Sequence, residues 1–275
     1  MSIFQAIILG IVQGLTEFIP ISSSGHLVLV KYLLGWEISP DAAFVFDVMV
    51  QVATLAAVFA YFWTDIVSIT RITIKDLRQK QPVAHFESKL AWLLIPATIP
   101  AGLFGLIFNG TFEKAFGSPK ATSFFLLVTA FLLVVSERYG QRSRSLSEIT
   151  LVDTIWIGIS QILALFPGIS RSGATIAGGM TRNLDRPDAA RFSFLMSIPI
   201  MILAGLFASL KLSKFPDFID LLPVFTIGFV TAAVTGYLSI RWLLNFLSSR
   251  SLYVFAIYCA AFGIFNLIII LIRGS

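Results

Sequence analysis

Two short polar segments lie in an otherwise strongly apolar chain, and their residue types could bind and process a phosphate group. The first, residues 13–26, reads QGLTEFIPISSSGH, and the second, residues 161–174, reads QILALFPGISRSGA. In the second segment Arg171 lies between two serines, and a guanidinium can bind two phosphate oxygens at once. Free amides at a helix N-terminus and nearby hydroxyls add further donors. The candidate phosphate-binding residues in and directly after this segment are Ser170, Arg171, Ser172, Gly173 and Thr175.

The first segment supplies an acid, hydroxyls and an imidazole. Gln13 and Glu17 are four residues apart, so a helix places both side chains on one face. Glu17 and His26 are candidate catalytic groups, because an ionisable side chain inside an apolar segment is costly unless it has a role. The alternative is that Glu17 caps the following turn or that Arg171 only pairs with it. Further candidate phosphate-binding residues are Ser22, Ser24 and Gly25.

The two segments are copies of an internal repeat. They align without a gap at an offset of about 148 residues, which pairs Gln13 with Gln161, Phe18 with Phe166, Ser22 with Ser170, Ser24 with Ser172 and Gly25 with Gly173. The copies differ where the chemistry is expected: Glu17 aligns with Leu165, Ser23 with Arg171 and His26 with Ala174. Each copy therefore holds groups that the other lacks, and one complete site needs both.

The composition identifies the surroundings of these segments as a membrane. Of the 275 residues 57% are hydrophobic and only 13% are charged, and the mean hydropathy is +0.88. A soluble globule of this size needs more polar surface. The runs long enough to cross about 30 Å of hydrocarbon as helices are residues 43–63, 90–108, 119–137, 191–210, 221–244 and 252–272.

The repeated segments predict a different element. Each begins with an apolar helical stretch, residues 3–19 or 151–166, and then breaks at Pro20 or at Pro167. Exposed polar backbone is costly in lipid, so we expect each break to be buried in protein or to line a wet cavity. We predict an all-α integral membrane protein with six transmembrane helices and two re-entrant helix-loop-helix hairpins.

Three spans separate the hairpins, and an odd number of crossings inverts the second copy. We expect one polytopic domain, residues 1–275, made of two inverted-topology repeats at about 1–138 and 150–272. The basic residues in the loops predict the orientation of the chain in the membrane. The side with more of them is expected to face the cytoplasm; that side includes Arg71, Lys75, Arg78 and Lys80. The net charge of +5 fits this topology and anionic lipid better than nucleic acid. Cys259 is the single cysteine, which excludes an intramolecular disulfide.

The strings QGLTEFIPISSSGH and PGISRSGATIAGGM, with FSFLMSIP after the second, resemble the signature motifs of the undecaprenyl pyrophosphate phosphatase family, the bacitracin-resistance type. The resemblance covers most of the chain. It implies a multi-pass protein of the bacterial inner membrane that hydrolyses a C55 polyprenyl diphosphate to the monophosphate carrier of cell-wall synthesis, using a divalent cation. The family's first motif opens with Glu or Gln, and this chain has the Gln version, at Gln13.

Phosphoryl transfer mainly requires positioning, charge neutralisation and an in-line nucleophile. Under the implied activity, Glu17 and Gln13 could bind Mg²⁺ or Ca²⁺, which take oxygen ligands. The nucleophile could be Ser23, or a water activated by Glu17 or His26; His26 could instead protonate the leaving group. Weaker cavity candidates are Asp47 and Gln51.

A second class of function stays open. Inverted repeats with broken helices are also a transporter design, so the same loops could carry a lipid phosphate or a small anion across the membrane. The expected partners are a polyprenyl diphosphate substrate and membrane lipid, without nucleic acid, and a homodimer is left open. Release of inorganic phosphate from a polyprenyl diphosphate separates the enzyme from a transporter.

Overall fold

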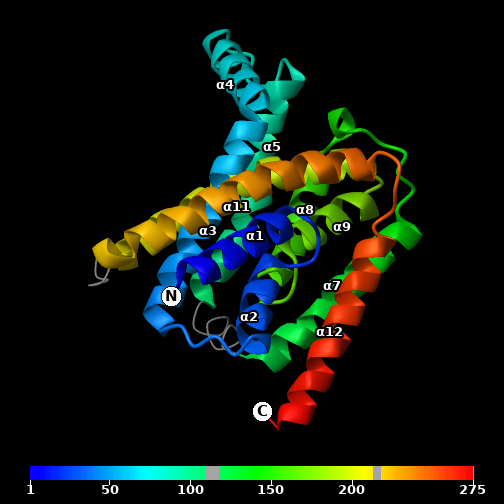
Figure 1. Cartoon of the computed structure of the whole chain (residues 1–275). Helices are drawn as coiled ribbons and strands as arrows, with labels where there is room; N and C mark the ends of the chain where they lie inside the picture. Colours follow the sequence, from blue (N-terminus) through cyan, green and yellow to red (C-terminus); the bar gives the residue numbers. More distant parts are fainter. Residues whose placement is uncertain (109–117, 213–217, 275) are drawn as a thin grey trace.

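The computed structural model describes residues 1–108, 118–212 and 218–274, with backbone only for residues 207–212 and 218–219. Within these ranges the regular structure is α-helical, apart from one 3₁₀ turn at Leu146–Glu148 and an isolated bridge between Arg144 and Leu184. The helices, traced in Figure 1, are α1 (Ile3–Phe18), α2 (Ser23–Leu33), α3 (Pro40–Tyr61), α4 (Trp63–Arg78), α5 (Phe86–Ile107), α7 (Pro119–Tyr139), α8 (Leu151–Leu163), α9 (Arg171–Thr181), α10 (Arg186–Leu212), α11 (Phe218–Leu247) and α12 (Tyr253–Arg273).

Six of the described helices are long and apolar enough to cross a membrane: α3, α5, α7, α10, α11 and α12. Each corresponds to one of the six apolar runs in the sequence, so the prediction of six spans is confirmed by length and composition. Two shorter apolar helices, α1 and α8, coincide with the stretches expected to begin the repeated segments.

Each repeated segment consists of a helix, a break and a second, shorter helix. In the first, α1 ends at Phe18, and Ser22 then caps α2 by accepting a hydrogen bond from the amide of Gly25 at 3.2 Å. In the second, α8 ends at Leu163, and Ser170 caps α9 by accepting from the amide of Gly173 at 3.0 Å. The aligned serines therefore have the same role: each accepts a hydrogen bond from a backbone amide that has no partner within the first turn of its helix.

The breaks use backbone conformations that a continuous helix does not. Ser22 has φ 74°, a left-handed value that is uncommon for a residue with a side chain, and Gly168 has φ 101°. A β-carbon at Gly168 would lie 2.3 Å from the carbonyl oxygen of Thr122 on α7, so the loop before α9 can pack against α7 only with glycine there. The chain therefore turns sharply at both breaks.

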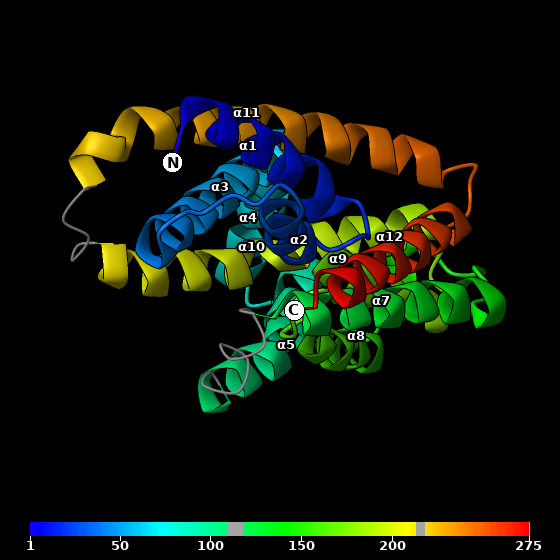
Figure 2. The same ribbon diagram turned by 60° about the horizontal axis from the view of Figure 1, so that its bottom comes forward.

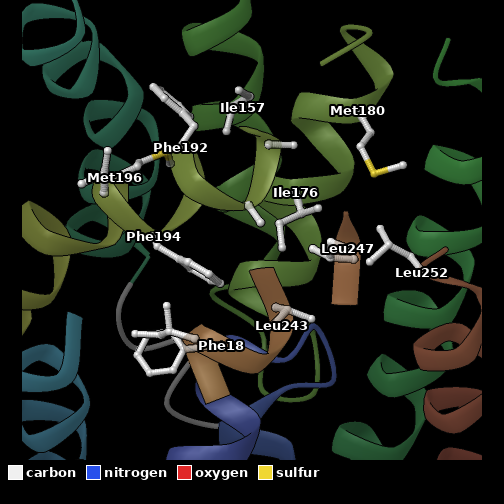
Figure 3. Close-up of a cluster of buried hydrophobic side chains, with 14 of the residues drawn as sticks. Phe18, Ile157, Ile176, Met180, Phe192, Phe194, Met196, Leu243, Leu247 and Leu252 are labelled. Carbon is white, nitrogen blue, oxygen red and sulfur yellow. The ribbon is translucent and has the colours of Figure 1, made fainter. Parts of the chain in front are cut away.

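Helices from both halves of the chain share one apolar core. Phe18, at the end of α1, packs edge-on against Phe194 of α10, with ring centroids 5.4 Å apart. Figure 3 shows this pair beside Ile176 of α9 and Leu243 of α11. Figure 2, turned by 60°, shows α1 lying along α11 and α7 lying along α12, so a helix of the first half packs against a helix of the second in both places. Core packing therefore holds the two repeated segments in fixed positions.

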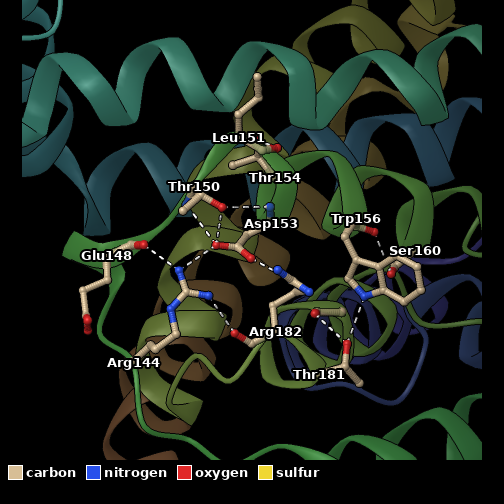
Figure 4. A network of polar contacts seen from close by, with 11 residues as sticks. Arg144, Glu148, Thr150, Leu151, Asp153, Thr154, Trp156, Ser160, Thr181 and Arg182 are labelled. Carbon is tan, nitrogen blue, oxygen red and sulfur yellow. Dashed lines mark hydrogen bonds and ion pairs between the residues drawn. The ribbon is translucent and has the colours of Figure 1, made fainter.

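A polar network holds the start of α8 against the end of α9, away from the repeated serines. Asp153 is fully buried and accepts hydrogen bonds from Arg144 Nη2 at 2.8 Å and Arg182 Nε at 2.7 Å (Figure 4). Thr150 donates its hydroxyl to the same carboxylate at 2.8 Å and caps α8. Because two cations and a hydroxyl compensate the buried charge, Asp153 anchors α8 and α9 as one unit.

Candidate active site

The central contact of the candidate site is an ion pair between the two repeated segments. Arg171, the first residue of α9, donates from Nη2 to Glu17 Oε1 at 2.9 Å, although 154 residues separate them. Glu17 lies in the last turn of α1 and is 7% exposed. The structure thus brings the acid of one copy to the arginine of the other, as the divergence of the copies led us to expect.

The second oxygen of Glu17 receives two more donors. Gln13 donates from Nε2 at 2.9 Å, and the Ser23 hydroxyl donates at 2.6 Å. Gln13 is one helical turn before Glu17, whereas Ser23 is the first residue of α2. Since Ser23 is partly exposed and hydrogen-bonded to a carboxylate, its hydroxyl is the candidate nucleophile with a base already in place.

The first residues of two helices meet at this carboxylate. Ser23 opens α2 and Arg171 opens α9, and each donates to Glu17. The loops themselves also touch, because a β-carbon at Gly25 would lie 3.2 Å from the α-carbon of Gly168. Helix N-termini carry partial positive charge and free amides, so this meeting point favours an anion.

Arg171 retains hydrogen-bonding capacity that the protein does not use. Its Nη1 is buried and has no hydrogen-bond partner among the described residues, while Nη2 is held by Glu17. A buried donor left unpaired costs free energy comparable to a lost hydrogen bond. A phosphate oxygen bound at Nη1 would remove that cost, so Arg171 is a candidate for binding an anion.

His26 is hydrogen-bonded through both of its ring nitrogens. Its Nδ1 lies 2.7 Å from the carbonyl oxygen of Ser22, and its Nε2 lies 2.7 Å from the hydroxyl of Tyr258 on α12. A carbonyl can only accept, so Nδ1 carries the proton and, in the neutral ring, Nε2 accepts from Tyr258. The imidazole also stacks on Phe262, with centroids 4.8 Å apart. His26 therefore supports the first turn of α2 and has no hydrogen bond to Glu17 or Ser23.

Tyr258 and Thr129 were missed by sequence reasoning. Thr129 of α7 accepts from the amide of Ser170 at 3.0 Å and donates to the carbonyl of Gly168 at 2.9 Å, so it holds the loop before α9 in place. Both residues lie within apolar spans that contain other hydroxyls, such as Ser136 on α7 and Tyr253 on α12. Neither belongs to a repeated motif, so the sequence does not single them out.

Several of the predicted phosphate-binding residues lie beside the ion pair and form hydrogen bonds within the protein. The hydroxyls of Ser170 and Ser172 are 3.1 Å apart, and Ser172 donates to the carbonyl of Ile19 at 3.4 Å, which ties α9 to the first break. Ser24 lies 3.4 Å from the Ser22 hydroxyl. Thr175 is buried and bonds to the backbone of α9 and to Ser193 on α10 at 2.6 Å. These contacts fix the positions of the first turns of α2 and α9.

The weaker candidates have other surroundings. Asp47 pairs with Lys31 at the far end of α2, at 3.1 Å, and Gln51 is exposed on α3. Neither residue has a hydrogen bond to Glu17 or Arg171. Asp47 therefore contacts α2 through Lys31, whereas Gln51 has no comparable contact in the part of the chain that the structure describes.

The comparisons with known proteins show the family of this chain. The model of the family described as "Bacitracin resistance protein BacA" matches residues 6–265. A protein of Thermomicrobium roseum is 41% identical over 98% of this chain and 99% of its own, and one of Chlorobaculum parvum is 44% identical over 98% of both. A third, from Myxococcus xanthus, is 40% identical over 98% of this chain and 90% of its own. All three are named undecaprenyl-diphosphatase. By motifs, by length and by the extent of this match, the chain belongs to the BacA family of bacitracin resistance proteins.

Proposed function

We propose that this protein hydrolyses undecaprenyl diphosphate to undecaprenyl phosphate and inorganic phosphate in a bacterial inner membrane. The names of its relatives support this substrate. The observation that carries the proposal is that one buried carboxylate, Glu17, joins a serine hydroxyl and an arginine with a free donor. That combination provides a nucleophile, a base and an anion holder within one cluster.

Arg171 and the start of α9 hold the diphosphate in this proposal. The unpaired Nη1 takes an oxygen of the terminal phosphate, and the amides at the N-termini of α2 and α9 add positive potential. The prenyl tail stays in the bilayer, so the site needs to enclose only the head group. Binding at Nη1 offsets the desolvation of this donor, which the ion pair of Nη2 with Glu17 leaves uncompensated.

Ser23 is the nucleophile that the geometry favours. Its hydroxyl proton passes to Glu17 at 2.6 Å while Oγ attacks the terminal phosphorus. The bond from that phosphorus to the bridging oxygen breaks, Glu17 passes its proton to that oxygen, and undecaprenyl phosphate leaves. Water then attacks the phosphoserine, with Glu17 as the base, and inorganic phosphate departs as the serine regains its proton. A water activated directly by Glu17 is the alternative route.

A divalent cation fits this site only with help from the substrate. The described residues contain no group of three His, Cys, Asp or Glu side chains that could hold a metal by themselves. Glu17, Gln13 and Ser23 do offer oxygen donors of the kind that Mg²⁺ and Ca²⁺ prefer, and such ions often complete their shell with phosphate oxygens. When bound, the cation would neutralise charge on the diphosphate.

The membrane arrangement is part of the proposal. We infer that α1 with α2 and α8 with α9 form re-entrant hairpins of two inverted repeats, about 1–138 and 150–272. The aligned Ser22 and Ser170 caps and the contact between Gly25 and Gly168 support this. The product would return the lipid carrier to peptidoglycan synthesis, and removal of its diphosphate form would account for bacitracin resistance.

The test is release of inorganic phosphate from undecaprenyl diphosphate by the purified protein in detergent. We expect activity in the parent protein and a covalent phosphoserine at position 23 on rapid quenching, detected by mass spectrometry. Asp65→Asn is a matched control, because Asp65 also pairs with an arginine across helices, at Arg191, but far from this cluster in the chain. This control should keep full activity.

Two outcomes would contradict the proposal, one by excluding the phosphatase activity and the other by excluding Ser23 as the nucleophile. Absence of phosphate release, with anion movement in proteoliposomes, would identify a transporter. Single-turnover incorporation of oxygen-18 from water into phosphate, without any adduct at Ser23, would leave the phosphatase intact and replace the serine route by direct attack of water.

A further inference from the structure

A long open groove runs along one face of α4, on the helical hairpin that α4 and α5 form. Its volume is about 720 Å³. Figure 1 shows this hairpin rising from the rest of the molecule. The lining residues recur every three or four positions, as one helix face requires; they are Trp63, Ile66, Val67, Thr70, Arg71, Ile74, Lys75, Arg78 and Gln79.

The lining of the groove changes from apolar to cationic along α4. Its first part is apolar, with Trp63, Ile66 and Val67, and α4 starts two residues after Tyr61, the end of candidate span α3. The cations follow from Arg71 to Arg78, roughly 12 to 22 Å further along the axis at 1.5 Å per residue. The face is therefore apolar next to the membrane span and cationic beyond it, which is the polarity of a phospholipid.

The acids of α4 do not neutralise these cations. Asp65 pairs with Arg191 of α10. Asp76 is buried on another face, where it accepts from Ser88 at 2.5 Å and from His85 at 2.8 Å. The Ser88 hydrogen bond, with those of His85, outweighs burial and holds the pKa of Asp76 below its usual range, so the carboxylate stays engaged there.

The three groove cations consequently lack acidic partners. Arg71, Lys75 and Arg78 are exposed and form no ion pair within the described residues. Lys75 and Arg78 lie in the last turn, where the helix dipole favours cations. Arg71 lies near the middle of α4, so the dipole does not explain it.

We propose that the α4 groove binds an anionic phospholipid from the leaflet at which α3 ends. The acyl chains lie against Trp63, Ile66 and Val67, and the phosphate lies among Arg71, Lys75 and Arg78. The positive-inside rule explains why cations occur on this side of the membrane, but not why three of them border one apolar groove. Charge complementarity selects an anionic head group over a zwitterionic one, because each basic residue near anionic lipid contributes about 1 kcal/mol.

The first experiment is native mass spectrometry of the full-length protein from micelles with equal amounts of phosphatidylglycerol and phosphatidylcholine. We expect retained phosphatidylglycerol to dominate, and the ratio to fall about fivefold for each cation replaced in Arg71→Gln, Lys75→Gln and Arg78→Gln variants. Lys80→Gln with Lys89→Gln is the control, since both lysines belong to the same hairpin but do not line the groove. Phosphate release in detergent should stay unchanged in all of them.

The second experiment locates the lipid. In a variant that keeps Trp63 as the only tryptophan, brominated phosphatidylglycerol should quench its fluorescence more than brominated phosphatidylcholine does, and the triple variant should lose the difference. Equal retention of both lipids by parent and triple variant would overturn the proposal. So would conversion from dimer to monomer in the triple variant without any change in lipid ratio, since a second copy would then cover this face.

Discussion

The two repeated segments have the same framework and different chemistry. Ser22 and Ser170 cap their helices in the same way, at 3.2 and 3.0 Å. Gln13 donates to Glu17, whereas Gln161, its aligned partner, is 3% exposed and has no hydrogen-bond partner for either side-chain atom among the described residues. The reason is that Leu165 occupies the position of Glu17. The capping scaffold persists in both copies while the reactive groups are divided between them.

The division of reactive groups between the two copies can be tested by substitutions that make the copies alike. Glu17→Leu gives the first copy the residue of the second, and Arg171→Ser gives the second copy the residue of the first. Each removes one side of the central ion pair and leaves the other buried charge unpaired. We expect kcat/KM for phosphate release to fall about a thousandfold in either variant.

The combination of these two changes sharpens the result. Groups that act as one unit are strongly non-additive, so the double variant should be about as inactive as each single variant. Multiplicative losses in the double variant would contradict a shared site. Circular dichroism of the purified variants checks that the helices remain.

The next largest expected effect distinguishes Ser23 from Ser24 in the first copy. Ser23→Ala removes the hydroxyl that donates to Glu17 and should lower kcat about a hundredfold or more. Ser24→Ala is the matched control, because Ser24 lies 3.4 Å from Ser22 and has no hydrogen bond to Glu17. It should lose less than about threefold. Equal effects of the two changes on kcat would refute the role of Ser23.

A smaller effect is expected at the imidazole, where the second copy has Ala174. Tyr258→Phe removes the donor to His26 Nε2, so kcat should fall about tenfold with KM unchanged, since one hydrogen bond that orients the ring is lost. Nitrogen-15 NMR of labelled histidine gives an independent readout, because the chain has only two histidines. With His85→Gln, the remaining His26 should show a protonated Nδ1 and a bare Nε2. A protonated Nε2 in the neutral ring would refute the assignment.

The smallest effect compares the two glutamines. Gln13→Leu removes a donor to Glu17 and should lower activity, whereas Gln161→Leu removes a buried amide without a partner. We expect Gln161→Leu to leave kcat/KM unchanged and to stabilise the protein by about 1 kcal/mol, because an unsatisfied buried amide costs roughly that much. Thermal unfolding in detergent measures the change. Lower stability in Gln161→Leu would mean that this amide is satisfied.

Much of the fold followed from apolar run length. The six candidate spans agree with the six predicted ones, and α1 and α8 begin and end close to the predicted bounds. The site was less predictable. The motifs named Glu17, Ser23 and Arg171, but Tyr258 and Thr129 could not be singled out, because each lies outside the motifs in an apolar helix that has other hydroxyls. The catalytic role predicted for His26 stays a prediction, and the hydrogen bonds of its ring nitrogens to Ser22 and Tyr258 could not be read from the motif.

The sequence by itself determined the apolar spans, the breaks in the repeated segments and the groups that can react, but not the helix α4, which lies in a segment that reads as a polar loop. Hydrophobic run length sets membrane spans, serine caps and proline breaks set helix ends, and the ungapped alignment of the two copies exposes their divergence. Only the tertiary structure decided which groups meet. Glu17 and Arg171 lie 154 residues apart in sequence and 2.9 Å apart in space, because the packing of helices from both halves brings the two breaks together. The local sequence supplies the donors and acceptors, and the packing of the core sets the distances between them.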